Sequence, residues 1–146
     1  DVIAAGKALR VGATIASEDV FPEEEARLSS TWGAGDLLAC AQGAITIDVI
    51  REQNLVANAV ERGRQFRETF DPGPGVTDVR GKGLMLAVEF DTKDRRDDVQ
   101  DAAFSRGLLT LGCGRKTLRL LPPLDVTERE IALGATLLAE AVAAAD

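Results

Sequence analysis

The chain has 146 residues, 45% of them hydrophobic, so it can bury the core of one ordinary domain. Its 24 acidic and 17 basic residues give a formal charge of −7. This charge argues against nucleic acid as a partner, because a phosphate backbone needs clustered Lys and Arg. The absence of His excludes Ser-His-Asp catalysis, Cys-His catalysis and histidine metal sites within these residues.

The sequence predicts a cytoplasmic protein with no membrane partner. No apolar run approaches the roughly 20 residues that span a bilayer, and no secretory signal is present. Cys40 and Cys113 are far apart, with no CxxC pair. Only four basic residues are Lys, and excess carboxylate with little Lys predicts a halophilic source; a GC-rich genome is the alternative explanation. Because the chain opens at Asp1 rather than at Met, we expect a piece of a longer protein.

The first part of the chain alternates short apolar runs with turns. These runs predict a strand at 1–5, a turn at 6–9, a strand at 11–16 and a polar loop at 21–30. A glycine-rich turn at 31–36 opens a helix, whose apolar stripe consists of Leu38, Ala41, Ile45 and Val49. A second helical run carries on one face Val56, Ala59, Val60, Gly63 and Phe66.

Beyond the breaker Pro72–Gly75, strand pairs alternate with helices. The predicted elements are strands at 76–80 and 84–90, a charged loop at 91–98, a helix to Ser105, and strands at 108–111 and 117–121. Thr127 and Glu130 then form a capping box, followed by a helix whose inward stripe consists of Ile131, Gly134, Leu138 and Val142. This order predicts an α/β protein, with an α+β layer sandwich from Asp71 onward. The first 35 residues do not fit that unit, so we expect them to belong to another domain.

Lys7 is the sharpest candidate for chemistry. It follows an apolar strand and has small neighbours, in a chain that otherwise avoids Lys. In a confined, partly desolvated site its amine becomes a nucleophile toward an aldehyde. A solvated surface lysine is the alternative.

Two further segments suggest anion binding. Residues 29–35 place hydroxyls and small side chains ahead of a helix, where free N–H groups and the helix dipole favour a phosphate; a plain N-cap is the alternative. Arg119 lies in the apolar strand TLRLLPP, where its guanidinium needs a carboxylate partner. That partner is either a substrate or an internal Asp or Glu.

Together, these features resemble the class III (omega-type) pyridoxal-phosphate-dependent aminotransferases. The matching segments are DVIAAGKAL at 1–9, RLSSTWGAGDLLA at 27–39, DVRGKGLMLAVE at 78–89 and GLLTLGCGRKTLRLLPPL at 107–124. The second segment is most similar to the 4-aminobutyrate and L-lysine 6-aminotransferase branches. The resemblance implies the C-terminal part of a fold type I transferase, with 1–35 a remnant of the large domain that binds the cofactor and 36–146 the small domain.

The resemblance also implies roles for three residues. Lys7 would carry pyridoxal 5'-phosphate as a Schiff base and move the substrate proton. Thr31 would bind the cofactor phosphate, in this family usually that of the neighbouring subunit of a homodimer. Arg119 would hold the α-carboxylate of the substrate. Family members often read Gly-Gly-Asn-Pro after the Thr, whereas this chain reads GAGD at 33–36, so the turn departs from the family pattern.

The implied reaction transfers an omega-amino group from 4-aminobutyrate, lysine or a similar donor to 2-oxoglutarate by a ping-pong route. The family's aspartate facing the pyridine nitrogen, its stacking aromatic residue and its phosphate loop all precede the lysine. We therefore expect the chain alone to bind the cofactor poorly and to be inactive. An aminomutase of the same fold and a non-catalytic α+β dimerisation or binding module are the alternatives.

Overall fold

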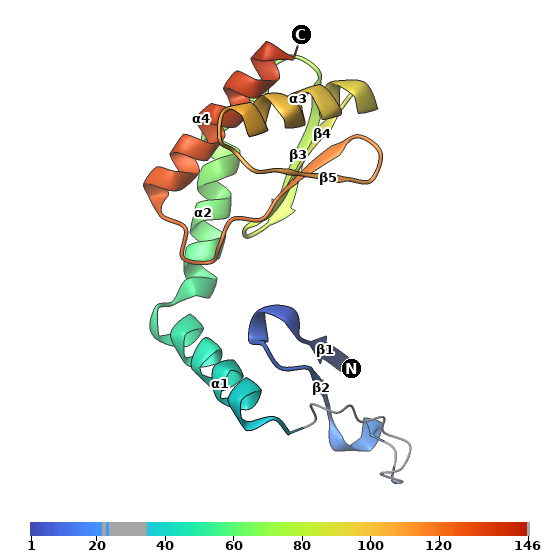
Figure 1. Ribbon diagram of the computed structural model, residues 1–146, viewed down its shortest axis with the longest axis vertical. Helices are drawn as coiled ribbons and strands as arrows, with labels where there is room; N and C mark the ends of the chain where they lie inside the picture. Colours follow the sequence, from blue (N-terminus) through green and yellow to red (C-terminus); the bar gives the residue numbers. More distant parts are fainter. Residues whose placement is uncertain (22, 24–34, 146) are drawn as a thin grey trace. The chain divides into compact units, whose positions relative to one another are not determined.

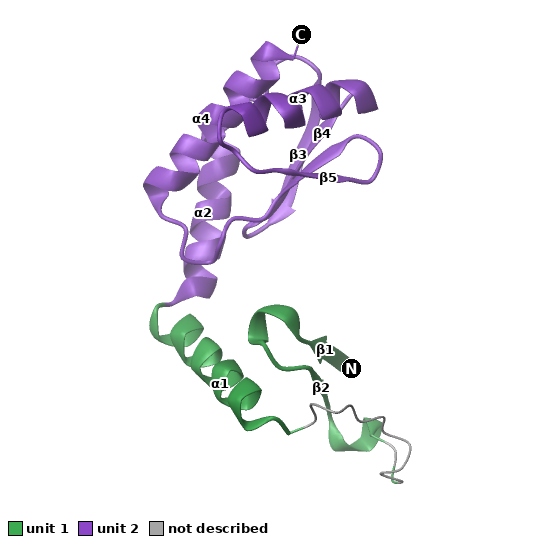
Figure 2. Cartoon of the chain, in the orientation of Figure 1, with its two compact units in different colours: residues 1–53 green, residues 54–146 purple. Residues whose placement is uncertain are grey.

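A computed structural model describes residues 1–21, 23 and 35–145. The chain divides into two compact units, residues 1–53 and 54–146 (Figures 1 and 2). The predicted boundary after residue 35 concerns the domains of the complete protein, and it stays a prediction. None of the helices in the described residues has the length and apolarity that crossing a bilayer requires.

The first unit contains a two-stranded antiparallel sheet and a long helix. Its elements are β1 (Val2–Ala5), the 3₁₀ helix η1 (Lys7–Leu9), β2 (Ala13–Ala16), the 3₁₀ helix η2 (Glu18–Val20) and α1 (Leu37–Glu52). The sheet pairs Val2 with Ala16 and Ala5 with Ala13, so the seven residues 6–12 form the connection between the strands. This arrangement confirms the predicted strand, turn and strand, although the second strand starts later than residue 11.

The second unit is a four-stranded antiparallel sheet with three helices. Its elements are α2 (Leu55–Thr69), β3 (Val76–Lys82), β4 (Met85–Phe90), α3 (Lys93–Ser105), β5 (Leu111–Cys113), β6 (Thr117–Leu120) and α4 (Glu128–Ala144). The strand order is β3-β4-β6-β5. This α+β unit confirms the layer sandwich predicted from the alternation of strand pairs and helices.

The core of the second unit lies between one face of the sheet and its helices. Side chains from α2, α3 and α4 pack there against alternate residues of β4 and β6. The sheet residues in this core are Leu86, Val88, Phe90, Leu118 and Leu120. Because strand side chains alternate between the two faces, the residues between them point away from the helices. We call this second surface the open face of the sheet.

The inward face of α2 differs from the prediction. Gly63 and Phe66 are buried, but Val56 and Val60 are 66% and 62% exposed. A Cβ placed on Gly63 would lie 2.0 Å from the carbonyl oxygen of Gly83 in the β3–β4 turn. This backbone contact fixes which side of α2 faces the sheet, and the valines fall outside it.

Three other predictions need correction. The segment predicted as a charged loop, residues 91–98, is mostly the first turns of α3, because Thr92 caps the helix by accepting a hydrogen bond from the Arg95 N–H at 3.2 Å. The strand predicted at 108–111 is displaced to β5. In α1 the buried residue is Gly43, whereas the predicted apolar stripe, including Leu38 and Ile45, is exposed in this chain.

Candidate active site

Lys7 has a strained backbone directly after β1. Its φ angle is 51°, in the left-handed region that L-residues other than Gly, Asn and Asp seldom adopt. The carbonyl of Lys7 accepts a hydrogen bond from the Arg10 N–H at 2.8 Å, which closes η1. Left-handed non-glycine residues cost of order 1–3 kcal/mol and cluster at functional sites. Arg10 and Asn54, with φ angles of 62° and 52°, share this region, so the strain marks the connection around Lys7 without singling out its side chain.

Helix α1 supports the segment that follows Lys7. A Cβ placed on Gly43 would lie 2.7 Å from Cγ1 of Val11 and 3.2 Å from the carbonyl oxygen of Leu9. The backbone of α1 thus approaches the β1–β2 connection more closely than a side chain at position 43 would allow. This contact holds the connection that presents Lys7.

The Lys7 side chain is exposed, and its amine has no ion pair or hydrogen bond with a residue that the structure describes. The confinement that the sequence predicts is therefore not supplied by the described residues of this chain. The amine is nevertheless uncommitted, which is the state that a nucleophilic lysine requires.

Thr31, the predicted phosphate ligand, lies outside the described residues, as do its neighbours 29, 30 and 32–34. The end of that segment is described: Gly35 has a φ angle of 73°, and Asp36 is the N-cap of α1. The Asp36 carboxylate accepts a hydrogen bond from the Ala39 N–H at 2.7 Å. At least one of the N–H groups that the sequence suggested for a phosphate is therefore occupied by this carboxylate.

Arg119 lies on the open face of the second unit's sheet. Its neighbours Leu118 and Leu120 point into the core, so the alternation of β6 places the guanidinium on the opposite side, where it is exposed. Arg119 pairs with Ala87 of β4 and with Leu111 of β5. Neither neighbour carries a charge or a hydrogen-bonding side chain. Among the described residues the Arg119 side chain has no ion pair, so the internal salt bridge considered from the sequence does not form there.

Four other charges of the open face are paired with one another, whereas Lys82, opposite Met85, has no ion pair among the described residues. Arg80 of β3 donates hydrogen bonds to Asp78 at 2.7 Å and to Glu89 at 2.8 Å. The Nζ atom of Lys116 lies 3.4 Å from the Glu89 carboxylate. The hydrogen bond from Arg80, assisted by Lys116, holds the pKa of Glu89 below its usual value. Sequence reasoning missed this network, although the period-two spacing of Asp78 and Arg80 indicated a shared face.

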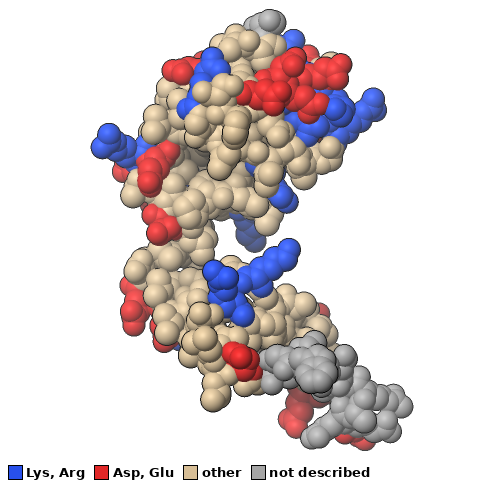
Figure 3. Space-filling model, in the orientation of Figure 1, with Lys and Arg blue, Asp and Glu red and all other residues tan. Residues whose placement is uncertain are grey.

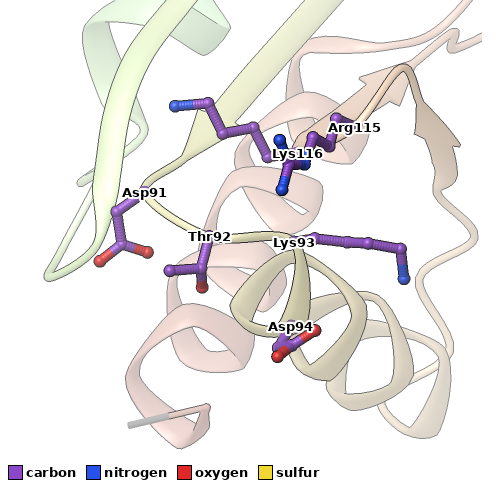
Figure 4. A pocket seen from close by; sticks show the side chains of 6 residues that line it. All are labelled: Asp91, Thr92, Lys93, Asp94, Arg115 and Lys116. Carbon is purple, nitrogen blue, oxygen red and sulfur yellow. The ribbon is translucent and has the colours of Figure 1, made fainter.

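Two cavities of the second unit contain neither Lys7 nor Arg119. A polar cavity of about 460 Å³ lies between the start of α3 and the β5–β6 turn (Figure 4). It is lined by Asp91, Thr92, Lys93, Asp94, Arg115 and Lys116. Lys93 pairs with Asp97 and Lys116 with Glu89, so both lysines are already neutralised. An apolar cavity of about 270 Å³ lies between the end of β6 and α4. Acidic and basic side chains are interspersed over the visible face of this unit (Figure 3).

The described residues therefore offer two uncommitted cations at positions predicted from the sequence, Lys7 in the first unit and Arg119 in the second. The sequence model of the aminotransferase class-III family matches residues 1–142. The chain belongs to the class III aminotransferases.

Similarities to individual aminotransferases support the assignment of this chain to the class III family. It is 32% identical to an L-lysine-epsilon aminotransferase of Amycolatopsis lactamdurans, over 98% of the chain and 34% of that protein. The structure of a lysine aminotransferase from M. tuberculosis in the internal aldimine form matches 100% of the chain and 36% of its own length, with 29% identity and a TM-score of 0.86. An ornithine delta-aminotransferase from Plasmodium falciparum matches 100% of the chain and 41% of its own length, with 32% identity and a TM-score of 0.87.

These matches confirm the predicted family and fold class, a fold type I transferase. The chain spans between 34% and 41% of the length of these relatives.

Proposed function

We propose that the complete protein is a pyridoxal-phosphate-dependent omega-aminotransferase. It transfers the terminal amino group of 4-aminobutyrate, lysine or a similar donor to 2-oxoglutarate, as a cytoplasmic homodimer. Family membership over 142 residues supports the reaction class. Lysine and ornithine aminotransferases among the similar proteins support a donor with a terminal amine.

The observation that carries the proposal is the uncommitted amine of Lys7 on a strained backbone. A cofactor with an aldehyde needs a primary amine that is not tied up in an ion pair. Arg10 shares the left-handed conformation of Lys7, so the strain belongs to the connection between β1 and β2 that presents the amine. The described residues therefore fit pyridoxal phosphate, whose aldehyde Lys7 would bind covalently. Thr31 is proposed as a ligand of its phosphate.

Two residues of the chain have separate proposed roles in the reaction, one in proton transfer and one in substrate binding. When bound, pyridoxal phosphate would supply an electron sink for the reacting carbon of the substrate. The Lys7 amine would take the proton from that carbon and return it. Arg119 grips the substrate carboxylate through two parallel N–H donors, which fixes the reacting carbon in place. The open face leaves this guanidinium without a competing partner.

Borohydride reduction of the full-length protein with added pyridoxal phosphate tests the role of Lys7. Reduction fixes the cofactor on the lysine that holds it, and peptide mass mapping locates the adduct. We expect a phosphopyridoxyl group on Lys7 and none in the Lys7→Gln variant. Lys82→Gln, which removes an exposed lysine of β3, is the matched control and should keep the Lys7 adduct.

An unlabelled Lys7 in the folded protein would instead favour the non-catalytic binding module. If Lys7 is labelled, profiling of amine donors with 2-oxoglutarate separates a transaminase from an aminomutase. Glutamate should accumulate with 4-aminobutyrate or lysine as donor. Rearrangement of a single amino acid without 2-oxoglutarate would point to the mutase.

The chain of 146 residues alone is expected to bind pyridoxal phosphate weakly and to be inactive. Lys7 and Thr31 are its proposed cofactor ligands, and the stacking and ring-nitrogen contacts of the family are expected upstream. A titration of the chain that follows cofactor absorbance checks this expectation. Affinity equal to that of the full-length protein would contradict it.

A further inference from the structure

Glu89 and Arg119 lie on adjacent strands of the open face, and no ion pair joins them in the described residues. Glu89 is directly opposite Thr117, and Ala87 is directly opposite Arg119. Glu89 and Arg119 are therefore diagonal neighbours on adjacent strands, with Cα atoms about 7–8 Å apart, which two long side chains can bridge. An Arg and a Glu in this relation can form an ion pair.

Two cations engage Glu89 from elsewhere on the open face. Arg80 lies on β3, which flanks β4 on the side away from β6. It donates a hydrogen bond to Oε2 of Glu89 at 2.8 Å. Lys116 lies 3.4 Å from its Oε1. Both carboxylate oxygens thus have a cationic partner, and this pairing lowers the pKa of Glu89. The side chain of Glu89 is only 27% exposed, so it has limited freedom to leave this position.

Among the described residues of the sheet, Arg119 has no other acidic neighbour on an adjacent strand. The cross-strand row that contains it runs Arg80, Ala87, Arg119, Leu111. The other carboxylate bound by Arg80, that of Asp78, is on β3, two strands from β6 and therefore about 10 Å away. Glu89 is consequently the acidic group of the open face that can compete for the Arg119 guanidinium.

We propose that Arg80 is a positioning residue that, with Lys116, holds Glu89 away from Arg119 and so keeps the guanidinium open for the substrate carboxylate. This inference rests on the proposed role of Arg119 in the complete enzyme. Without Arg80, Glu89 swings across the diagonal and occupies Arg119 as an internal competitor. Substrate binding then weakens, whereas the chemical step is untouched once substrate has displaced Glu89.

Steady-state kinetics of the full-length enzyme with 2-oxoglutarate test the inference. Arg80→Gln should raise KM for 2-oxoglutarate about tenfold, a coupling typical of neighbouring groups in one charge network, with kcat within about twofold. Adding Glu89→Gln to this variant should restore KM to near the wild-type value, because the competitor is gone. Adding Asp78→Asn instead should restore nothing, since Asp78 cannot reach Arg119.

The double variants distinguish competition from damage to the fold. If Arg80→Gln with Glu89→Gln remains as impaired as Arg80→Gln alone, or if Arg80→Gln leaves KM unchanged, the inference is wrong. Thermal unfolding of each variant checks that the sheet is intact. Arg64→Gln removes an Arg that pairs with Glu68 on the exposed side of α2, and it should leave KM unchanged.

Arg119→Gln separates this inference from the proposed function. A large rise in KM for 2-oxoglutarate in Arg119→Gln, combined with a normal KM in Arg80→Gln, refutes only the role of Arg80. A normal KM in Arg119→Gln refutes the carboxylate role of Arg119, and the inference falls with it.

Discussion

The contact between α2 and the β3–β4 turn gives the sharpest test of the packing. Gly63 lies in the middle of α2, and a Cβ at this position would lie 2.0 Å from the carbonyl oxygen and 2.5 Å from the carbonyl carbon of Gly83. Both partners are backbone, so no side chain can rotate to make room. Gly63→Ala should therefore force the helix and the turn apart.

The size of the effect follows from a comparison with a second helical glycine. At Gly134 in α4, an added Cβ would meet only Cδ1 of Leu108, at 3.9 Å. Ala is favoured over Gly inside a helix by about 1 kcal/mol at both positions, so this term cancels between the two variants. The difference in unfolding free energy is then the overpacking cost, about 1–3 kcal/mol, with Gly63→Ala the less stable.

Urea denaturation followed by circular dichroism measures this difference. With a slope of about 1–3 kcal/mol per M, the two midpoints should lie about 1 M apart. Gly134→Ala should be at least as stable as the unmodified protein. Equal midpoints for the two variants would show that Gly63 does not pack against the turn backbone, and the account of which α2 face is buried would fail.

Three further perturbations test the second unit. Thr127→Ala removes the cap of α4 and should lower the unfolding free energy by about 1 kcal/mol, as measured in urea; no change would contradict the capping box. Hydrogen bonds from the N–H and hydroxyl of Thr127 lower the pKa of Glu130, so its contribution to stability is present at pH 7 and is lost as the pH falls below about 4. The stability gap between the wild type and Glu130→Gln should therefore close on acidification, and a constant gap would refute this. Phe90→Ala empties a fully buried site and should cost about 3–5 kcal/mol, whereas Met85→Ala on the open face should cost little.

The order of helices and strands was predictable because short sequence patterns determine where each element begins and ends. Two strand-like runs separated by residues 81–83 predicted β3 and β4, the spacing of Thr127 and Glu130 predicted the start of α4, and Gly and Pro marked the turns. The α3 start was missed because the dense charges of 91–98 read as solvated loop. In fact they form pairs one helical turn apart, such as Asp91 with Arg95 at 3.1 Å, which stabilise the first turns.

The face of a helix was less predictable than its existence. Val56 and Val60 look like core residues by spacing, but a glycine at 63 lets α2 approach a turn that is distant in sequence. Only the tertiary contact decides the rotation of the helix. The same limit applies to α1, where hydrophobicity predicted a buried stripe and the described chain leaves it exposed.

The candidate site was also predictable only in part. The sequence indicated Lys7 and Arg119 through residue type and neighbours, and their side chains are uncommitted among the described residues. The network of Arg80, Glu89 and Lys116 depends on cross-strand register, which sets neighbours that are far apart along the chain. A linear reading of the sequence could not show that Glu89 is engaged and Arg119 is not.

The left-handed backbone at position 7 sets two selective pressures against each other. Folding alone would favour Gly there, because Gly adopts a φ angle of 51° at no steric cost. A protein that gained stability by this replacement would lose its amine in the same step. With the proposed role of Lys7, Lys7→Gly would raise stability and abolish the attachment of the cofactor in the same step.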